Sequence, residues 1–209
     1  MRVALSALLL AGSIGSCAFF TEEGFQPVRH NARLTADVTY VSNVDIDGPA
    51  GKADSDLDEE MYQLALEFED ADGFAPYLQF GSGSWTFDWP GELDLHRYSA
   101  GARWYTESLG DTGSWFEGTR AYGDLGLSLI DPDKIQDATE LHSYNTGFSA
   151  NFGAGLQRTF KEDLFFELGL LASIGLIEET VKDTTTSATA ENDWDFYNLS
   201  LVIGIGRRF

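Results

Sequence analysis

The sequence predicts an all-β protein in which eight antiparallel strands run up and down around a closed barrel that spans a membrane. The first observation is a regular alternation of apolar and small polar residues, clearest over residues 142–160, because a period of two is the signature of a β-strand. The second is the unequal length of the connections, since membrane barrels have short turns at one end and long loops at the other. After residue 16, moreover, no apolar run is long enough for a transmembrane helix.

The alternation defines eight expected strands. Their approximate ranges are 33–41, 61–69, 74–86, 95–105, 115–129, 142–160, 164–176 and 196–209. In the fifth range Phe116 and Tyr122 are out of phase with Leu125, so we expect a β-bulge there. The expected long extracellular loops are the polar connections at 42–60, 130–140 and 178–195. An even number of strands places both termini of the chain in the periplasm.

The composition of the two strand faces indicates which solvent surrounds the barrel. A soluble barrel turns its apolar face inward and exposes charged residues to water. Here the polar faces consist mainly of Gly, Ser, Asn, Thr and Gln, whereas the apolar faces carry bulky residues such as Phe148 and Leu168. Small polar residues suit the narrow interior of an eight-stranded barrel, and in lipid a sheet must close so that every backbone group is hydrogen-bonded. We therefore expect the bulky side chains to face lipid.

The N-terminal residues have the features of a targeting segment. Arg2 precedes an apolar run at residues 3–14 and a small-residue exit, which is the pattern of a secretory signal peptide. The tetrapeptide Ile14–Cys17 resembles a bacterial lipoprotein signal, which implies lipidation of Cys17, whereas cleavage after Ala18 is the alternative. We expect a signal peptide at residues 1–17, a periplasmic tail at 18–31 and the barrel at 32–209.

Two segments of the sequence resemble strands of the small outer-membrane barrels of the OmpA/OmpX type from Gram-negative bacteria. They are Gly153–Gln157 and the C-terminal Leu201–Phe209. A last strand that ends in Phe209 is similar to the signal read by the barrel-assembly machinery, although Arg207 stands where an apolar residue is usual. The resemblance covers residues 34–209. It implies a transmembrane barrel of the cell outer membrane, in contact with membrane lipid, lipopolysaccharide and the assembly machinery.

Several charged residues fall on the inward, polar side of the expected strands. These residues are Arg33, Asp37, Glu67, Glu69, Arg97, Arg103 and Glu167. Because an isolated charge in a low-dielectric interior is very costly, we expect them to pair as a structural ion network that blocks the lumen. The alternative is a narrow or gated ion path in which such charges set selectivity.

The acidic composition excludes several kinds of partner. With 34 acidic and 13 basic residues, and a net charge of −21, the chain lacks the basic clusters that nucleic-acid binding needs. It also does not suit electrostatic docking on an anionic membrane surface. The spacing of Asp54, Asp56 and Asp58 matches the start of an EF-hand calcium loop. The sixth and twelfth positions of such a loop require Gly and Glu, but this sequence has Glu59 and Ala65 there. We therefore expect no metal site and no cofactor.

The sequence does not favour an enzyme. Lipid-modifying outer-membrane barrels use a Ser/His/acid set, whereas here the serines near His96 and His142 lie on the opposite strand face, so no nucleophile adjoins its base. We expect a monomeric integral barrel with a structural, surface-interaction or narrow-pore (porin-like) role. The alternative is a lipid-anchored, lipocalin-like soluble barrel that binds an apolar ligand, and a lipid-modifying enzyme is less favoured.

Overall fold

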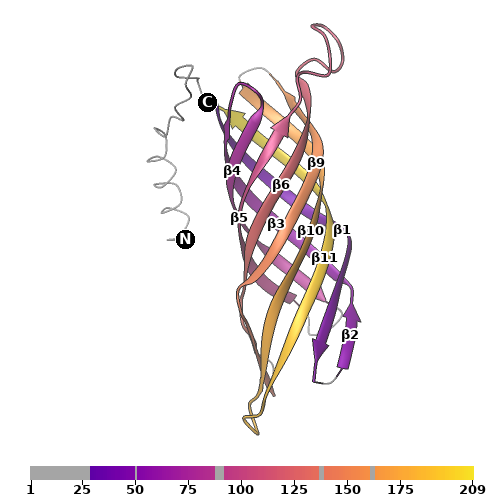
Figure 1. Ribbon diagram of the computed structural model, residues 1–209, viewed down its shortest axis with the longest axis vertical. Coiled ribbons are helices and arrows are strands. Elements are labelled where there is room, and N and C mark those ends of the chain that lie inside the picture. The colour runs from indigo at the N-terminus through magenta and orange to yellow at the C-terminus, as the bar shows by residue number, and fades with distance from the viewer. Residues whose placement is uncertain (1–28, 50, 88–91, 137–138, 161–162) are drawn as a thin grey trace.

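The computed structural model describes residues 29–209, with gaps at residues 50, 88–91, 137–138 and 161–162. In these residues eight long strands form one closed antiparallel barrel, and pairing of β11 with β1 closes it (Figure 1). The barrel strands are β1 (Arg29–Gly48), β3 (Leu57–Glu69), β4 (Phe74–Phe87), β5 (Glu92–Tyr105), β6 (Thr119–Pro132), β9 (Gly147–Thr159), β10 (Leu164–Asp183) and β11 (Thr189–Arg208). The predicted fold class is confirmed. No helix in the described part of the chain has the length and apolar character to cross a membrane.

The two ends of the barrel differ in their connections. Arg29 and Phe209 lie at the end that we call proximal, where the backbone N–H of Phe209 donates to the carbonyl of His30 at 2.8 Å. The proximal connections are residues 70–73, 106–118 and 160–163. At the opposite, distal end, drawn at the bottom of Figure 1, three short strands extend the wall. These are β2 (Gly51–Ser55), β7 (Ile135–Gln136) and β8 (Glu140–Tyr144).

The turn at residues 70–73 shows how a local sequence sets a proximal connection. The Asp70 carboxylate accepts the backbone N–H groups of Asp72 and Phe74 at 3.0 and 2.9 Å. Gly73 has a φ of 80° and carries no Cβ, which would otherwise lie 2.7 Å from the carbonyl oxygen of Tyr105. The turn forms because Asp and Gly supply the hydrogen bonds and the backbone conformation that it needs.

The segments predicted as long distal loops are mostly strands, so this prediction was wrong. β1, β10 and β11 each have 20 residues, roughly 66 Å at about 3.3 Å per residue, which is more than a bilayer requires. Their distal halves alternate exposed charged residues with buried apolar ones such as Ile177 and Phe196. Because this apolar burial stabilises paired strands in water, the strands continue beyond the membrane-sized part of the wall. We call this part the distal extension.

The bulge expected in the fifth strand does not occur. β6 pairs with both β5 and β9 without a register shift. Phe116 is out of phase because it belongs to the preceding turn, where its carbonyl accepts the N–H of Thr119 at 3.0 Å. A register shift occurs instead in β1, between Thr39 and Val41.

The sixth expected strand is interrupted, and the barrel begins earlier than predicted. β8 ends at Tyr144 and β9 begins at Gly147, so that His142 is buried while Phe148 is 58% exposed. An uninterrupted strand would have placed both on one face. At the N-terminal side, β1 starts at Arg29 rather than at residue 32, and residues 30 and 31 of the expected tail pair with β3. The expected signal and Cys17 lie outside the described residues.

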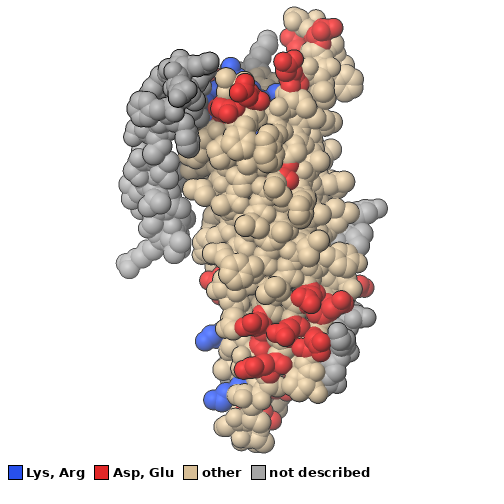
Figure 2. Space-filling view, in the orientation of Figure 1, with Lys and Arg blue, Asp and Glu red and all other residues tan. Residues whose placement is uncertain are grey.

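Bulky apolar side chains cover the outer face between the proximal rim and the distal extension, a surface that we call the belt. Phe148 is 58% exposed and Leu168 is 46% exposed. On β10 the belt runs from Leu164 to Leu176, roughly 40 Å along the strand. At the usual tilt of about 40° this is about 30 Å in height, the thickness of a bilayer's hydrocarbon core. Figure 2 shows the belt as an almost uncharged band.

Candidate functional site

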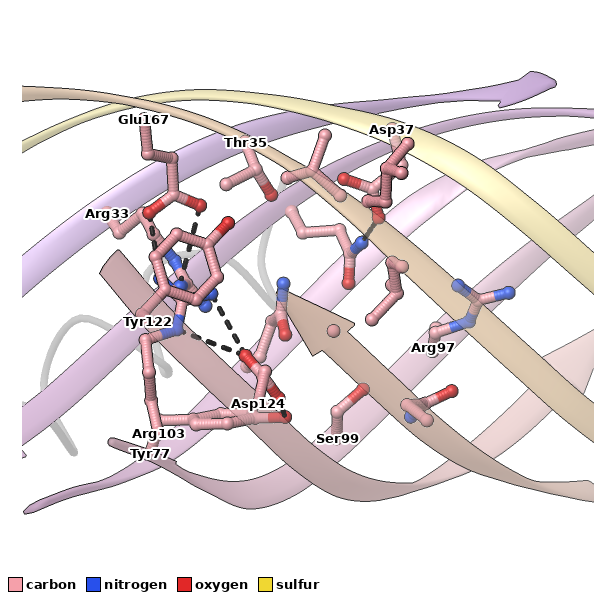
Figure 3. Close-up of a pocket in the computed structure, with 17 residues that line it drawn as sticks. Arg33, Thr35, Asp37, Tyr77, Arg97, Ser99, Arg103, Tyr122, Asp124 and Glu167 are labelled. Atoms are coloured by element: carbon pink, nitrogen blue, oxygen red, sulfur yellow. Dashed lines mark hydrogen bonds and ion pairs between the residues drawn. The ribbon is translucent and has the colours of Figure 1, made fainter. Parts of the chain in front are cut away.

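The proximal half of the lumen contains an ion network built by five strands. Arg33 on β1 lies 2.9 Å from Glu67 on β3. Arg103 on β5 lies 2.8 Å from Glu167 on β10 and 2.9 Å from Asp124 on β6, and Figure 3 shows it bridging the two carboxylates. None of these five side chains is more than 5% exposed. Such shared, hydrogen-bonded contacts offset the cost of removing charges from water.

Tyrosine side chains complete this network, and glycines provide the space for them. The hydroxyl groups of Tyr77 and Tyr105 donate to Asp124 and Glu67, each at 2.8 Å. The Arg103 guanidinium lies 3.9 Å from the ring centroid of Tyr122, a cation–π contact. A Cβ on Gly155 would lie 2.6 Å from the Tyr122 hydroxyl. Glycine on the polar strand face therefore allows an aromatic ring to cross the narrow interior.

A second group of polar side chains closes the proximal rim. Arg120 on β6 forms an ion pair with Glu69 and donates to the Gln157 side-chain oxygen at 2.9 Å. The same oxygen accepts Arg208 of β11 at 3.0 Å. Glu69 also accepts the side-chain amide of Asn31 at 3.1 Å. Outside this rim lies an open hollow of about 480 Å³ lined by the turns of the proximal end.

The middle of the lumen is polar but largely uncharged. The hydroxyl groups of Ser99 and Ser128 lie 2.7 Å apart, and Ser128 accepts the side-chain amide of Asn151 at 2.5 Å. Asp37 accepts a hydrogen bond from the Gln63 side chain. A cavity of about 20 Å³ lies between these groups and the ion network, which is space for about one or two water molecules.

On the distal side of this cavity, a guanidinium and an indole share one carboxylate. Arg97 donates through both terminal nitrogens to Glu59, at 3.2 and 2.6 Å. The indole nitrogen of Trp85 donates to the same carboxylate at 2.6 Å. All three side chains are buried. They form the boundary between the polar lumen and an apolar region on its distal side.

The distal mouth of the lumen is filled by an apolar cluster. Trp85 packs edge-on against Phe196, with ring centroids 5.0 Å apart. The other members, none more than 3% exposed, are Val44, Met61, Leu93, Leu95, Ile130, Ile177 and Trp194. We call these nine residues the distal plug. Together with the ion network in the proximal half, the plug leaves no wide channel among the described residues.

A buried histidine–carboxylate pair lies in the distal extension, beside the plug. His142 Nδ1 lies 2.7 Å from Glu179, which also accepts the side chains of Asn192 at 2.7 Å and Trp194 at 3.1 Å. Burial raises the pKa of the nearby Tyr144 phenol well above its usual value, and the Glu179 carboxylate raises it further. His142 is internal although Phe148 faces outward, because the strand is broken between β8 and β9.

The outer surface of the distal extension is strongly acidic. Exposed carboxylates ring the barrel directly beyond the belt, where Figure 2 shows Asp and Glu gathered in its lower part. They include Asp45, Asp58, Glu60, Asp94, Asp131, Asp133, Glu178, Glu191, Asp193 and Asp195. In the described chain, no three His, Cys, Asp or Glu side chains are grouped so as to hold a metal ion. The structure does not describe the side chain of Asp54, the first residue of the sequence that resembles a calcium loop.

The structure places all seven charged residues singled out in the sequence inside the barrel, each at most 3% exposed. It brings Arg33, Glu67, Arg103 and Glu167 into one network, whereas Glu69 belongs to the rim and Arg97 to the boundary with the plug. Sequence reasoning missed several partners of these residues. They are Glu59, Asp124, Arg120, Gln157 and Arg208. Continuing the alternation of strand faces through Leu57–Glu60 would have indicated Glu59.

Comparison of the structure with solved structures places it among small eight-stranded transmembrane barrels. The outer membrane protein OprG from Pseudomonas aeruginosa matches with a TM-score of 0.62 and 14% identity, over 88% of this chain and 97% of that chain. Neisserial surface protein A (NspA) matches with a TM-score of 0.51 and 11% identity, over 86% of this chain and 97% of that chain. Comparison with family models found no match, and comparison with curated proteins found no significant match. At these identities the likeness shows a shared fold.

Proposed function

We propose that the chain is an integral protein of the cell outer membrane, with a closed lumen and a structural and surface-interaction role. The belt is the observation that carries this proposal. Soluble monomers rarely expose contiguous apolar patches beyond a few hundred Å², whereas here such side chains encircle the barrel over about 30 Å of height. The resemblance to OmpA/OmpX-type barrels and the signal features at residues 1–17 support the same location.

The contents of the lumen favour a closed barrel over the narrow pore that the sequence left open. A continuous aqueous path would have to pass the proximal ion network and then the distal plug. The cavity between them holds about 20 Å³, and every carboxylate of the network contacts a guanidinium. We therefore assign the interior charges a structural role.

The two alternative functions receive less support. A lipocalin-like barrel would hold an apolar ligand inside, but the belt residues Phe148 and Leu168 face outward and the distal plug is already packed. An enzyme would need a nucleophile beside its base, whereas His142 is buried and its contacts include the carboxylates Glu140 and Glu179. We propose that the partners are outer-membrane lipid, lipopolysaccharide and, during assembly, the barrel-assembly machinery.

Three measurements test this proposal. An integral barrel should migrate differently on gels before and after heating, and it should stay in the membrane fraction during carbonate extraction. In planar bilayers the closed lumen should give no steady conductance. Release by carbonate would overturn the membrane assignment, whereas stable single-channel steps would overturn the closed lumen. Radiolabelled palmitate incorporation that is lost in Cys17→Ser would establish the predicted lipidation separately.

A further inference from the structure

The middle of the lumen contains one buried carboxylate that the ion network leaves out. Around this part of the lumen the structure describes five carboxylates and three guanidinium groups. Four of the carboxylates, those of Glu59, Glu67, Asp124 and Glu167, each lie 2.6 to 2.9 Å from a guanidinium. Asp37 is 1% exposed and forms no ion pair with any described residue. Its Oδ2 accepts the Gln63 side chain, whereas its Oδ1 has no described hydrogen-bond partner.

Asp37 lines the cavity of about 20 Å³ described above, and so does a second unpartnered oxygen (Figure 3). Thr35, two residues earlier on the same face of β1, is 2% exposed, and its hydroxyl lacks a described partner. The polar side chains of Gln63, Ser99 and Asn151 also line the cavity. A polar cavity of this size has room for one ion with a water molecule.

We propose that this cavity binds a monovalent metal cation such as Na⁺, with Asp37 Oδ1 and Thr35 Oγ1 as protein ligands. A buried carboxylate without a counter-charge is costly. The five carboxylates and three guanidinium groups leave two negative charges in excess, and a bound cation compensates the charge of Asp37, the carboxylate that forms no ion pair. Oxygen ligands suit hard cations. A monovalent ion is favoured over a divalent one because three guanidinium groups, those of Arg33, Arg97 and Arg103, also line the cavity and repel an ion of higher charge more strongly. The hydroxyl of Thr35, which has no described partner, supplies a second oxygen ligand for a metal ion.

The site requires the folded barrel, because Asp37 and Thr35 on β1 meet Ser99 on β5 and Asn151 on β9 only when the wall is closed. Bound cation therefore stabilises the folded state. At a cation concentration ten times the dissociation constant, the ratio of folded to unfolded protein rises about 11-fold. Exposed carboxylates respond mainly to ionic strength, since their interactions with any small cation are screened.

Urea unfolding of the full barrel in detergent micelles tests this prediction, in NaCl and in choline chloride at equal ionic strength. Wild-type protein should be more stable in NaCl, and Asp37→Asn should be equally stable in both salts. Glu60→Gln is the control, because it removes an exposed carboxylate from the outer surface and should keep the difference between the salts. Equal stability of the wild type in both salts would overturn the proposal.

A structural measurement identifies the occupant directly and does not depend on how well the variant folds. Crystals soaked in thallium(I) should show an anomalous peak next to Asp37 Oδ1 in the wild type. If the cavity lacked this peak, and infrared spectra showed a protonated carboxyl band that disappears in Asp37→Asn, the charge would be neutralised by a proton and the cation site would be disproved.

Discussion

The belt and the distal extension are built from the same strands but have opposite distributions of side chains. In the belt part of β10, Leu170 is 51% exposed and the interior is polar. A few residues further along the same strand, Ile177 is 1% exposed and Glu178 faces outward. The period of two continues unchanged through both parts. What changes is the kind of residue on each face.

The reversal follows from the two solvents. Around the belt, hydrocarbon accepts apolar side chains on the outside, so the interior can hold arginines and carboxylates if they pair. Around the distal extension the solvent is water, so carboxylates lie outside and the plug of aromatic and aliphatic residues lies inside. One wall therefore changes from the design of a membrane barrel to that of a soluble one at the level of Leu176 and Ile177.

The largest expected effect comes from breaking the ion network inside the belt. Arg103→Ala leaves Asp124 and Glu167 without their closest guanidinium, and removing one partner of a buried ion pair costs about 3–5 kcal/mol. The free energy of unfolding, measured by urea titration in phospholipid vesicles, should fall by this amount. Arg29→Ala, at an exposed residue of the proximal rim, is the control and should change stability by less than about 0.5 kcal/mol. Similar losses for both variants would contradict the internal network.

Two isoleucines on β10 compare the inside of the extension with the outside of the belt. Ile177 is 1% exposed in the distal plug, whereas Ile174 is 60% exposed on the belt. Ile177→Ala should cost about 2–5 kcal/mol, because it removes apolar burial and leaves a cavity. Ile174→Ala should cost less, since lipid chains fill the space. The same urea titration measures both variants, and an equal or larger loss at Ile174 would show that the plug is not packed.

A charge placed on each outer surface separates the two solvents. Leu170→Arg puts a guanidinium in the middle of the belt and should cost about 2–4 kcal/mol in vesicles. Glu191→Arg, at an exposed position of the distal extension, should change the unfolding free energy by less than about 0.5 kcal/mol. If the arginine were equally tolerated at both positions, lipid would not be the solvent of the belt.

The smallest expected effect concerns the acidic ring. Asp195 on β11 lies directly opposite Asp45 on β1, and both are exposed. Like charges in such a pair are destabilising, so Asp195→Asn should raise the unfolding free energy by about 0.2–1 kcal/mol. The gain should disappear at high salt because of screening. A gain that persists at high salt would point to a cause other than repulsion between the two carboxylates.

Local patterns were sufficient for most of the barrel. The alternation of Leu164, Phe166 and Leu168 with small or charged residues predicted β10, its outward face and the kind of solvent around it. The same alternation placed Arg33, Asp37 and Glu67 inside. It failed at 178–195, where exposed charges were interpreted as a loop although Trp194 and Phe196 continue the buried face.

The sequence by itself determined which face of most barrel strands turns inward, because backbone geometry alternates the two faces and bulky apolar residues mark the outer one. Only the tertiary structure decided which inward groups meet. Arg103 reaches Glu167 across 64 positions of the chain, and Asp37 contacts no guanidinium although Arg97 and Arg33 line the same cavity. These contacts depend on strand order, register and the height of each residue in the closed wall, and no local pattern encodes such long-range geometry.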